Sequence, residues 1–206
     1  MDRVWYVAYG SNLSSARFRC YVAGGQPAGG ARTYVGCRDR RAPAEDAPVE
    51  IPGAVYFGGR SRVWGGGMAT YDPHARGSVA GRAYLLTVGQ LADVVAQETR
   101  TPVEAALDLR RIHPATGRLH LGPGRYRTLV RVGVRRGIPL VTLAADRDHD
   151  RDVAAPSAAY LATMATGLAE SRGWPPAVIG RYLAALTGAR PRWTASAIAE
   201  LAPAAA

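Results

Sequence analysis

The chain contains no lysine, only two cysteines, and no glycine motif of the kind that binds nucleotides. All 26 of its basic residues are arginine, which excludes a phosphate-binding P-loop because that motif requires a lysine. No Gly-x-Gly-x-x-Gly follows a strand pattern, so a nucleotide cofactor is not expected. Only Cys20 and Cys37 are present, which suits a reducing compartment. A disulfide between them is allowed by the sequence but nothing requires it.

Long apolar runs are also missing. No stretch has the length of a membrane span, and the Met1-Asp2-Arg3 start lacks the features of a signal peptide. We therefore expect a cytoplasmic protein with no membrane partner. With 206 residues, of which 48% are hydrophobic, the chain is long enough for one domain with a sizeable core. We assign residues 1–188 to this domain and residues 189–206 to a C-terminal helical extension with a loose, alanine-rich tail.

Metal-binding patterns are absent from the sequence as well. The four histidines do not form His-Glu-x-x-His, and no cysteine pair stands in register with them. The charged run from Asp146 to Asp152 has Arg151 where a calcium loop needs glycine and Ser157 where it needs glutamate. We expect no metal site and no cofactor.

The net charge of +10 and the pI near 10.3 raise the question of nucleic-acid binding. The arginines are spread from Arg3 to Arg192, however, and do not form one basic block with interleaved aromatic residues. Abundant arginine, alanine, glycine and proline without lysine is also what a GC-rich coding sequence produces. We expect no nucleic-acid partner and favour an acidic small-molecule substrate.

The opening stretch of the chain is the first candidate site. Residues 4–9 are rich in aromatic and β-branched side chains and predict a strand, which runs into the turn residues Gly10, Ser11 and Asn12. Ser14 and Ser15 then supply N-cap hydroxyls for a helix near residues 16–22. A strand, a small polar loop and a helix N-terminus can direct free N–H groups at one point, which suits a carboxylate or a developing oxyanion. The structural alternative is an ordinary βα turn.

Further elements follow from periodicity. Strands are expected at residues 31–38, 54–58, 67–71, 79–87, 126–135 and 138–144, with the last two forming a hairpin through Arg136-Gly137. Residues 38–52 are charged, contain proline and lack a period, so they predict a surface excursion over the site. Ser157 and Gly173 cap one C-terminal helix, and a second follows Trp174-Pro175-Pro176. The order of elements indicates an α+β domain, with a mixed, curled sheet forming a small barrel and flanking helices.

Glu98 is the second candidate. The helix that begins at Val88 has an apolar stripe at Leu91, Val94 and Val95, and the next position of that stripe is occupied by Glu98. Pro102 follows closely, so Glu98 falls in the last turn, where the helix dipole disfavours a negative charge. A carboxylate in this setting is suited to proton transfer. The alternative is a frayed helix end with Glu98 in solvent.

Three segments in order resemble the γ-glutamylcyclotransferase-like (AIG2-like) family. They are Tyr6-Val7-Ala8-Tyr9-Gly10-Ser11-Asn12-Leu13, Trp64-Gly65-Gly66-Gly67-Met68-Ala69-Thr70, and Pro156-Ser157-x-x-Tyr160 followed by Gly167 and Gly173. The resemblance spans residues 3–187, with residues 20–53 and 99–123 matching poorly. It implies the same fold, with Glu98, in its Gln97-Glu98 context, facing the Tyr-Gly-Ser-Asn loop. Thr99 and Arg100 follow Glu98 where a glycine is common in that family.

The resemblance implies an enzyme that cleaves a γ-glutamyl amine or amide. The substrate's α-amine would attack its own γ-carbonyl, which gives 5-oxoproline and a free amine. Glu98 would be the catalytic base, and Tyr9, Gly10, Ser11, Asn12, Leu13 and Tyr126 would bind the substrate, with the loop amides facing the oxyanion and Gly10 letting the backbone approach. Natural-product tailoring on the same fold, by γ-glutamyl deprotection or a related acyl transfer, and a non-catalytic binding module remain alternatives. A monomer or a homodimer is expected.

Overall fold

The structure, a computed structural model, describes residues 2–101, 107–122, 126–145 and 152–204. Its centre is a six-stranded mixed sheet with the strand order β2-β5-β1-β8-β7-β6. These strands are β1 Arg3–Ala8, β2 Asp46–Pro52, β5 Ser78–Thr87, β6 Arg118–His120, β7 Thr128–Arg135 and β8 Ile138–Ala144. β1 pairs in parallel with β8, and the other neighbouring strands pair antiparallel. A separate sheet of two strands joins β3 Ala54–Gly58 to β4 Met68–Asp72.

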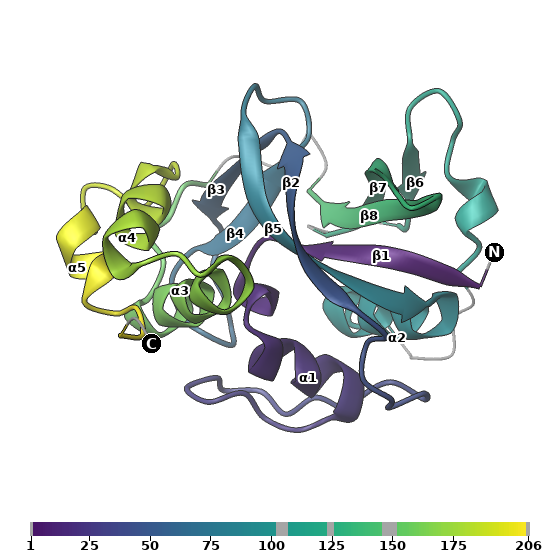
Figure 1. The fold of residues 1–206 in the computed structure, drawn as a ribbon, viewed down its shortest axis with the longest axis horizontal. Coiled ribbons are helices and arrows are strands. Elements are labelled where there is room, and N and C mark those ends of the chain that lie inside the picture. The colour runs from purple at the N-terminus through teal and green to yellow at the C-terminus, as the bar shows by residue number, and fades with distance from the viewer. Residues whose placement is uncertain (1, 102–106, 123–125, 146–151, 205–206) are drawn as a thin grey trace.

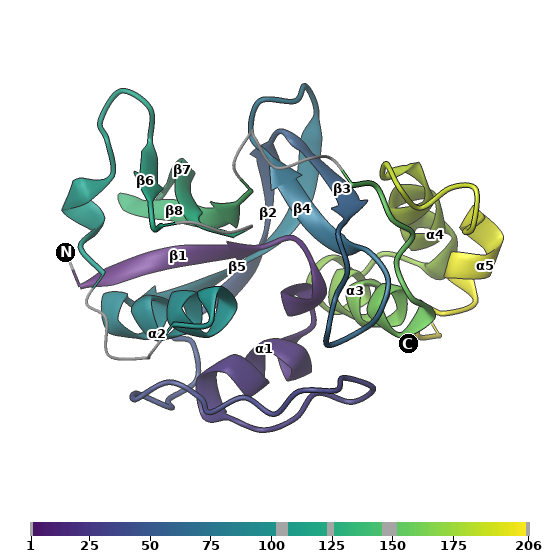
Figure 2. The same cartoon turned by 180° about the vertical axis from the view of Figure 1, so that it is seen from behind.

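Helices lie on both sides of the large sheet (Figure 1). α1 Ser15–Ala23 and α2 Val88–Thr99 lie side by side on one face. α3 Ala158–Arg172, α4 Pro176–Ala185 and α5 Ala195–Ala199 gather on the other side, next to β3 and β4 (Figure 2). Two 3-10 helices complete the fold, η1 Ser11–Leu13 and η2 Leu109–Arg111. Among the described residues, none of the helices has the length and apolar character needed to cross a membrane.

β1 is the strand that divides the hydrophobic core in two. Successive side chains of a strand point to opposite faces, and nearly all of β1 is buried. Val4, Tyr6 and Ala8 pack into the core beneath α1 and α2, whereas Trp5 and Val7 pack into the core shared with α3, α4 and α5. β1 therefore ends, at η1, where the two helical layers meet.

The predicted α+β class with a mixed sheet and flanking helices is confirmed, but the sheet does not close into the barrel that was expected. It curls far enough for β2 to approach β7, yet β2 and β6 remain its two edges. β6 has only three residues, and Pro48 and Pro52 each remove a backbone donor from β2. Both features oppose the pairing that closure would need.

Two segment predictions were wrong. Residues 31–38 do not form a strand; within them, Tyr34 makes an isolated bridge to Gly25. The predicted surface excursion over residues 38–52 ends in β2, which pairs along its whole length with β5. Only one side chain of β2, Ile51, is fully buried, because β2 is an edge strand, and its sequence therefore shows little apolar periodicity.

The other elements lie close to their expected positions. β7 and β8 form the hairpin through Arg136-Gly137. The Ser157 hydroxyl accepts a hydrogen bond from the Tyr160 amide at the start of α3, and Gly173 ends this helix with a φ of 62°. α5 packs against α4, and its Ile198 side chain is completely buried.

Candidate active site

A cavity lies at the junction of several segments of the chain. They include the end of β1, η1, the start of α1, the end of α2, the segment before β4 and the start of α3. Its empty volume is about 610 Å³, open mouth included. Seven of the 18 described residues that line it are aromatic, among them Tyr6, Tyr21 and Trp64. Arg17 and Glu98 are the two charged residues among the described residues that line it. The cavity is therefore a largely apolar pocket with a few polar groups, as expected of a small-molecule site.

The loop from Tyr9 to Leu13 forms one wall of this cavity. Tyr9, Gly10, Ser11 and Asn12 line it, whereas the fully buried Leu13 side chain packs into the core beside α3. The chain turns here because the Leu13 amide donates to the Gly10 carbonyl at 3.0 Å, and Ser14 then caps α1. The structure therefore brings four of the five predicted loop residues to the cavity.

β5 holds this loop from outside. The Tyr84 hydroxyl donates to the Asn12 carbonyl at 2.9 Å, and an Arg82 Nη1 donates to the Leu13 carbonyl at 3.2 Å. The guanidinium of Arg82 is itself fixed by ion pairs with Asp46 and Glu170, each at 2.8 Å or less. The orientation of the loop thus depends on buried polar contacts far from it in sequence.

The structure limits which loop amides can face a ligand. The Leu13 amide is used within the turn, and the Ser11 amide faces the Tyr160 hydroxyl, which also accepts from the Ala69 amide at 3.1 Å. The amides of Gly10 and Asn12 remain as candidate donors. A Cβ on Gly10 would lie 2.8 Å from the Tyr160 hydroxyl, so the glycine is also required by its contact with this tyrosine.

Glu98 reaches the cavity from the last turn of α2, as the periodicity predicted. Its Oε1 accepts a hydrogen bond from Asn12 Nδ2 at 3.1 Å, and the same amide nitrogen lies 3.3 Å from the Tyr6 hydroxyl. Asn12 and Glu98 are 86 positions apart in the chain, so the fold assembles this pair. Glu98 is half-buried, which places it neither in the core nor free in solvent.

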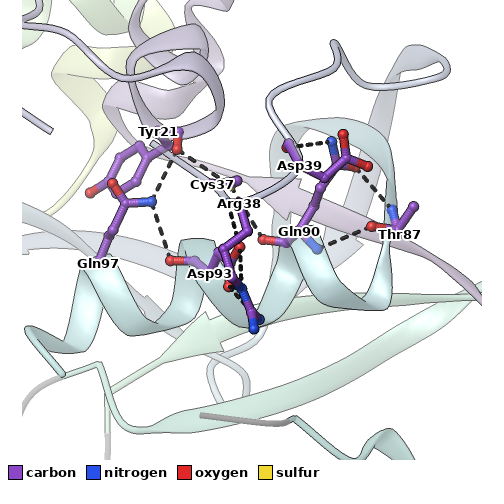
Figure 3. Close-up of polar contacts among 8 residues, drawn as sticks. All are labelled: Tyr21, Cys37, Arg38, Asp39, Thr87, Gln90, Asp93 and Gln97. Atoms are coloured by element: carbon purple, nitrogen blue, oxygen red, sulfur yellow. Dashed lines mark hydrogen bonds and ion pairs between the residues drawn. The ribbon is translucent and has the colours of Figure 1, made fainter. Parts of the chain in front are cut away.

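Buried polar side chains of α2 form hydrogen bonds with residues 38–41, in the segment that follows α1 (Figure 3). Gln90 donates to the carbonyls of Asp39 and Arg41, and the buried Asp93 carboxylate accepts from the amide and the guanidinium of Arg38. Gln97 donates to the Tyr21 carbonyl at 3.0 Å, which ties α2 to α1 directly. These bonds hold α2 in place up to Gln97, the residue before Glu98.

The remaining predicted residues, Tyr9 and Tyr126, also line the cavity. Their hydroxyls donate to main-chain carbonyls, Tyr9 to Leu143 at 2.7 Å and Tyr126 to Ala69. The protons of both hydroxyls are therefore engaged within the protein, and each can offer only its oxygen to a ligand.

Four buried tyrosines of the cavity stay protonated near neutral pH. Burial raises the pKa of Tyr160 to about 12, and it raises the pKa values of Tyr6, Tyr9 and Tyr21 above the usual range. No histidine, cysteine or second carboxylate is found among the described residues that line the cavity. Glu98 is consequently the one carboxylate among the described residues that line the cavity.

Sequence reasoning missed Arg17 and the aromatic residues around it. Arg17 lies on the buried face of α1 with Phe18 and Tyr21, and it is only 4% exposed. An arginine four positions before a tyrosine on an otherwise apolar face was the available signal. The resemblance had included Tyr160 and Trp64 in its motifs without giving either a role.

A second hollow opens beside the cavity and shares seven lining residues with it, among them Glu98, Tyr34 and Tyr126. Five arginines line this hollow: Arg32, Arg60, Arg62, Arg100 and Arg127. Glu98 is the one carboxylate among the described residues around it. This concentration of positive charge attracts anions to the mouth of the cavity.

Cys20 and Cys37 are free thiols. The described residues hold no group of three or more histidine, cysteine, aspartate or glutamate side chains able to bind a metal ion. The charged run considered in the sequence lies, from residue 146 to 151, outside the described residues.

Comparisons with known proteins agree on the fold. A γ-glutamyl cyclotransferase structure superposes with a TM-score of 0.50 and 16% identity, covering 97% of this chain and 98% of that one. An uncharacterized human protein superposes with a TM-score of 0.54 and 18% identity, covering 90% and 89% of the two chains. The chain therefore has the γ-glutamylcyclotransferase-like fold. No protein-family model matches the sequence.

One curated relative matches in sequence. It is Histone deacetylase 5 of Arabidopsis thaliana, 31% identical over 185 residues. The match covers 81% of this chain but only 28% of that protein. The chain thus corresponds to about a quarter of the relative's length.

Proposed function

We propose that this protein is a γ-glutamylcyclotransferase-type enzyme, which converts a γ-glutamyl amine or amide to 5-oxoproline and a free amine. The fold supports this proposal, but the observation that carries it is the position of Glu98. Glu98 is the one carboxylate among the described residues that line the cavity, and no histidine or cysteine stands beside it there to act as a base. An intramolecular aminolysis needs one such group.

In the proposed reaction, Glu98 removes a proton from the substrate's α-ammonium. The free amine attacks the γ-carbonyl carbon, a C–N bond forms, and the carbonyl oxygen becomes an oxyanion. The Gly10 and Asn12 amides are candidate donors to this oxyanion, and Tyr160 can donate as well because its oxygen already accepts from the Ala69 amide. Glu98 then returns the proton to the leaving nitrogen as the original amide bond breaks.

Ring closure joins two groups of one molecule, so proximity supplies much of the rate acceleration. The Asn12–Glu98 hydrogen bond at 3.1 Å suits Glu98 as the base, since it fixes one carboxylate oxygen and leaves the other to accept a proton from the ammonium. The segment that matches the plant relative is only 28% of that protein, so the relative's name does not support a deacetylase activity for this chain. A tailoring enzyme that removes a γ-glutamyl group would use the same site on a larger amine.

The test is incubation of the purified protein with γ-glutamyl dipeptides and glutathione, with 5-oxoproline measured by mass spectrometry. Glu98→Gln keeps the shape and removes the base, so we expect kcat to fall about 10²-fold to 10⁴-fold, with a smaller change in substrate binding. Glu200→Gln, an exposed site next to α5, is the matched control and should keep full activity. Absence of 5-oxoproline with every substrate, or an unchanged rate in Glu98→Gln, would overturn the mechanism.

A further inference from the structure

Two groups that line the cavity carry buried polar atoms that have no partner in the protein. Among the described residues, Arg17 Nε and Nη1 and Asn12 Oδ1 are buried without a hydrogen bond. A buried polar atom without a partner costs about 1–3 kcal/mol. Arg17 supplies unsatisfied donors and Asn12 an unsatisfied acceptor, and both residues line the same cavity.

Among the described residues, Arg17 makes no direct ion pair with a carboxylate, and aromatic rings surround its charge. Its guanidinium lies 4.5 Å from the ring centre of Tyr21 and 4.3 Å from that of Tyr34, and its Nη2 donates to the Tyr34 hydroxyl at 2.7 Å. Burial acts to lower the pKa of Arg17, but Tyr21, Tyr34 and Glu98 outweigh it, so the pKa is raised. Aromatic faces stabilise this cation, yet they leave two of its nitrogens unpaired.

The orientation of Asn12 follows from its neighbour. A carboxylate accepts hydrogen bonds, so the atom that faces Glu98 is Nδ2, and Oδ1 must point elsewhere. The cavity thus brings together a carboxylate and an amide oxygen as acceptors and an unpaired guanidinium as a donor. An α-amino acid head group carries the complementary pair, an ammonium and a carboxylate on one carbon.

We propose that Arg17 is the receptor for the α-carboxylate of the substrate, while Glu98 and Asn12 Oδ1 receive its α-ammonium. This inference rests on the proposed function and makes it more specific. Arg17 determines specificity by requiring a free α-carboxylate, because an unpaired guanidinium nitrogen forms a strong, charge-assisted hydrogen bond with a carboxylate. The amine that attacks is then placed next to its base by the same contacts that recognise the head group.

The experiment compares γ-glutamyl dipeptides with analogues whose α-carboxylate is replaced by a carboxamide of equal size. For the wild type, kcat/KM should favour the carboxylate by about 10-fold to 100-fold, the value of a charge-assisted hydrogen bond. In Arg17→Gln the carboxylate substrate should lose this advantage while the carboxamide changes little. Arg17→Lys should retain part of the preference. Arg181→Gln, an exposed site on α4, is the matched control.

A purely structural role for Arg17 predicts that both substrates lose rate equally, and that result would overturn the proposal. A wild-type protein with equal kcat/KM for the carboxylate and the carboxamide substrate would also overturn the proposal. If no substrate gives 5-oxoproline, the proposed function fails, but calorimetric titration with L-glutamine and L-glutaminamide still tests the head-group site. Binding of L-glutamine alone, abolished in Arg17→Gln, supports it; equal binding of both, or none of either, refutes it.

Discussion

Gly167 lies in the middle of α3, where the loop from Gly10 to Ser14 crosses the helix. A Cβ at this position would lie 2.2 Å from the Leu13 carbonyl carbon and 2.3 Å from the Ser14 nitrogen. Both are backbone atoms, which cannot rotate away. Gly167→Ala must therefore separate the loop from α3 by about 1.2 Å, the distance between 2.2 Å and the 3.4 Å where ordinary contact begins.

Two opposing terms decide the effect of this substitution on stability. Alanine in a helix interior gains about 0.5–1 kcal/mol over glycine, whereas overpacking of a core costs about 1–3 kcal/mol. We expect a net loss of about 1–2 kcal/mol in the free energy of unfolding. A displacement of the loop by about 1 Å should also lower kcat about 10²-fold, because the reacting groups are no longer aligned.

Two controls separate these effects. Gly89→Ala, near the start of α2, meets nothing closer than 3.8 Å, so it should stabilise the protein and leave turnover unchanged. Gly180→Ala places a Cβ 2.1 Å from the Ala195 carbonyl oxygen, so it should destabilise the packing of α4 on α5 without changing kcat. Urea unfolding followed by far-UV circular dichroism gives stability, and 5-oxoproline release gives kcat. A folded Gly167→Ala variant with the kcat of the wild type would refute the reasoning.

Three further outcomes are expected. Gly10→Val should abolish turnover with an unchanged far-UV spectrum, since even its Cβ would lie 2.8 Å from the Tyr160 hydroxyl; activity equal to that of the wild type would remove the loop from the mechanism. Burial raises the pKa of the Cys37 thiol to about 12, so a thiol reagent should modify Cys20 and leave Cys37 unmodified in the native protein. The unfolded chain releases this proton first, so the free energy of unfolding should begin to fall as the pH rises above about 8.5. Cys37→Ala should remove the part of this fall that precedes titration of the buried tyrosines, which begins at about pH 10. Affinity for duplex DNA or RNA at physiological salt should be no tighter than about 10⁻⁴ to 10⁻⁶ M, and submicromolar binding in an anisotropy assay would contradict this.

The parts of the fold that the sequence predicted well are those coded locally. β1, the turn after it and the caps of α3 each depend on residues within a few positions of one another. The position of Glu98 was predictable for the same reason, because a seven-residue spacing on one helix face fixes where a side chain points. Its orientation toward Asn12 was implied by the resemblance alone, since no local pattern links residues 86 positions apart.

The parts that were missed depend on contacts between distant segments. Arg17 in isolation reads as a solvent-exposed charge on a short helix, and it becomes a cavity residue only when Tyr34 and Trp64 pack around it. β2 was missed because an edge strand buries few side chains. Closure of a barrel cannot be read from strand patterns at all, because it depends on whether the two edge strands can pair.

The arginines show that residues far apart in the sequence can still form one charged surface. They are scattered along the sequence, yet five of them, from segments as far apart as Arg32 and Arg127, line one hollow beside the cavity. This hollow is concave and continues into the cavity through Glu98, Tyr34 and Tyr126. Positive charge placed there acts along the route to a small aromatic pocket, where it raises the local concentration of small anions. A substrate with a free carboxylate would meet these arginines first and Arg17 last, so the same charge that favours its approach also leads to the group that we propose recognises it.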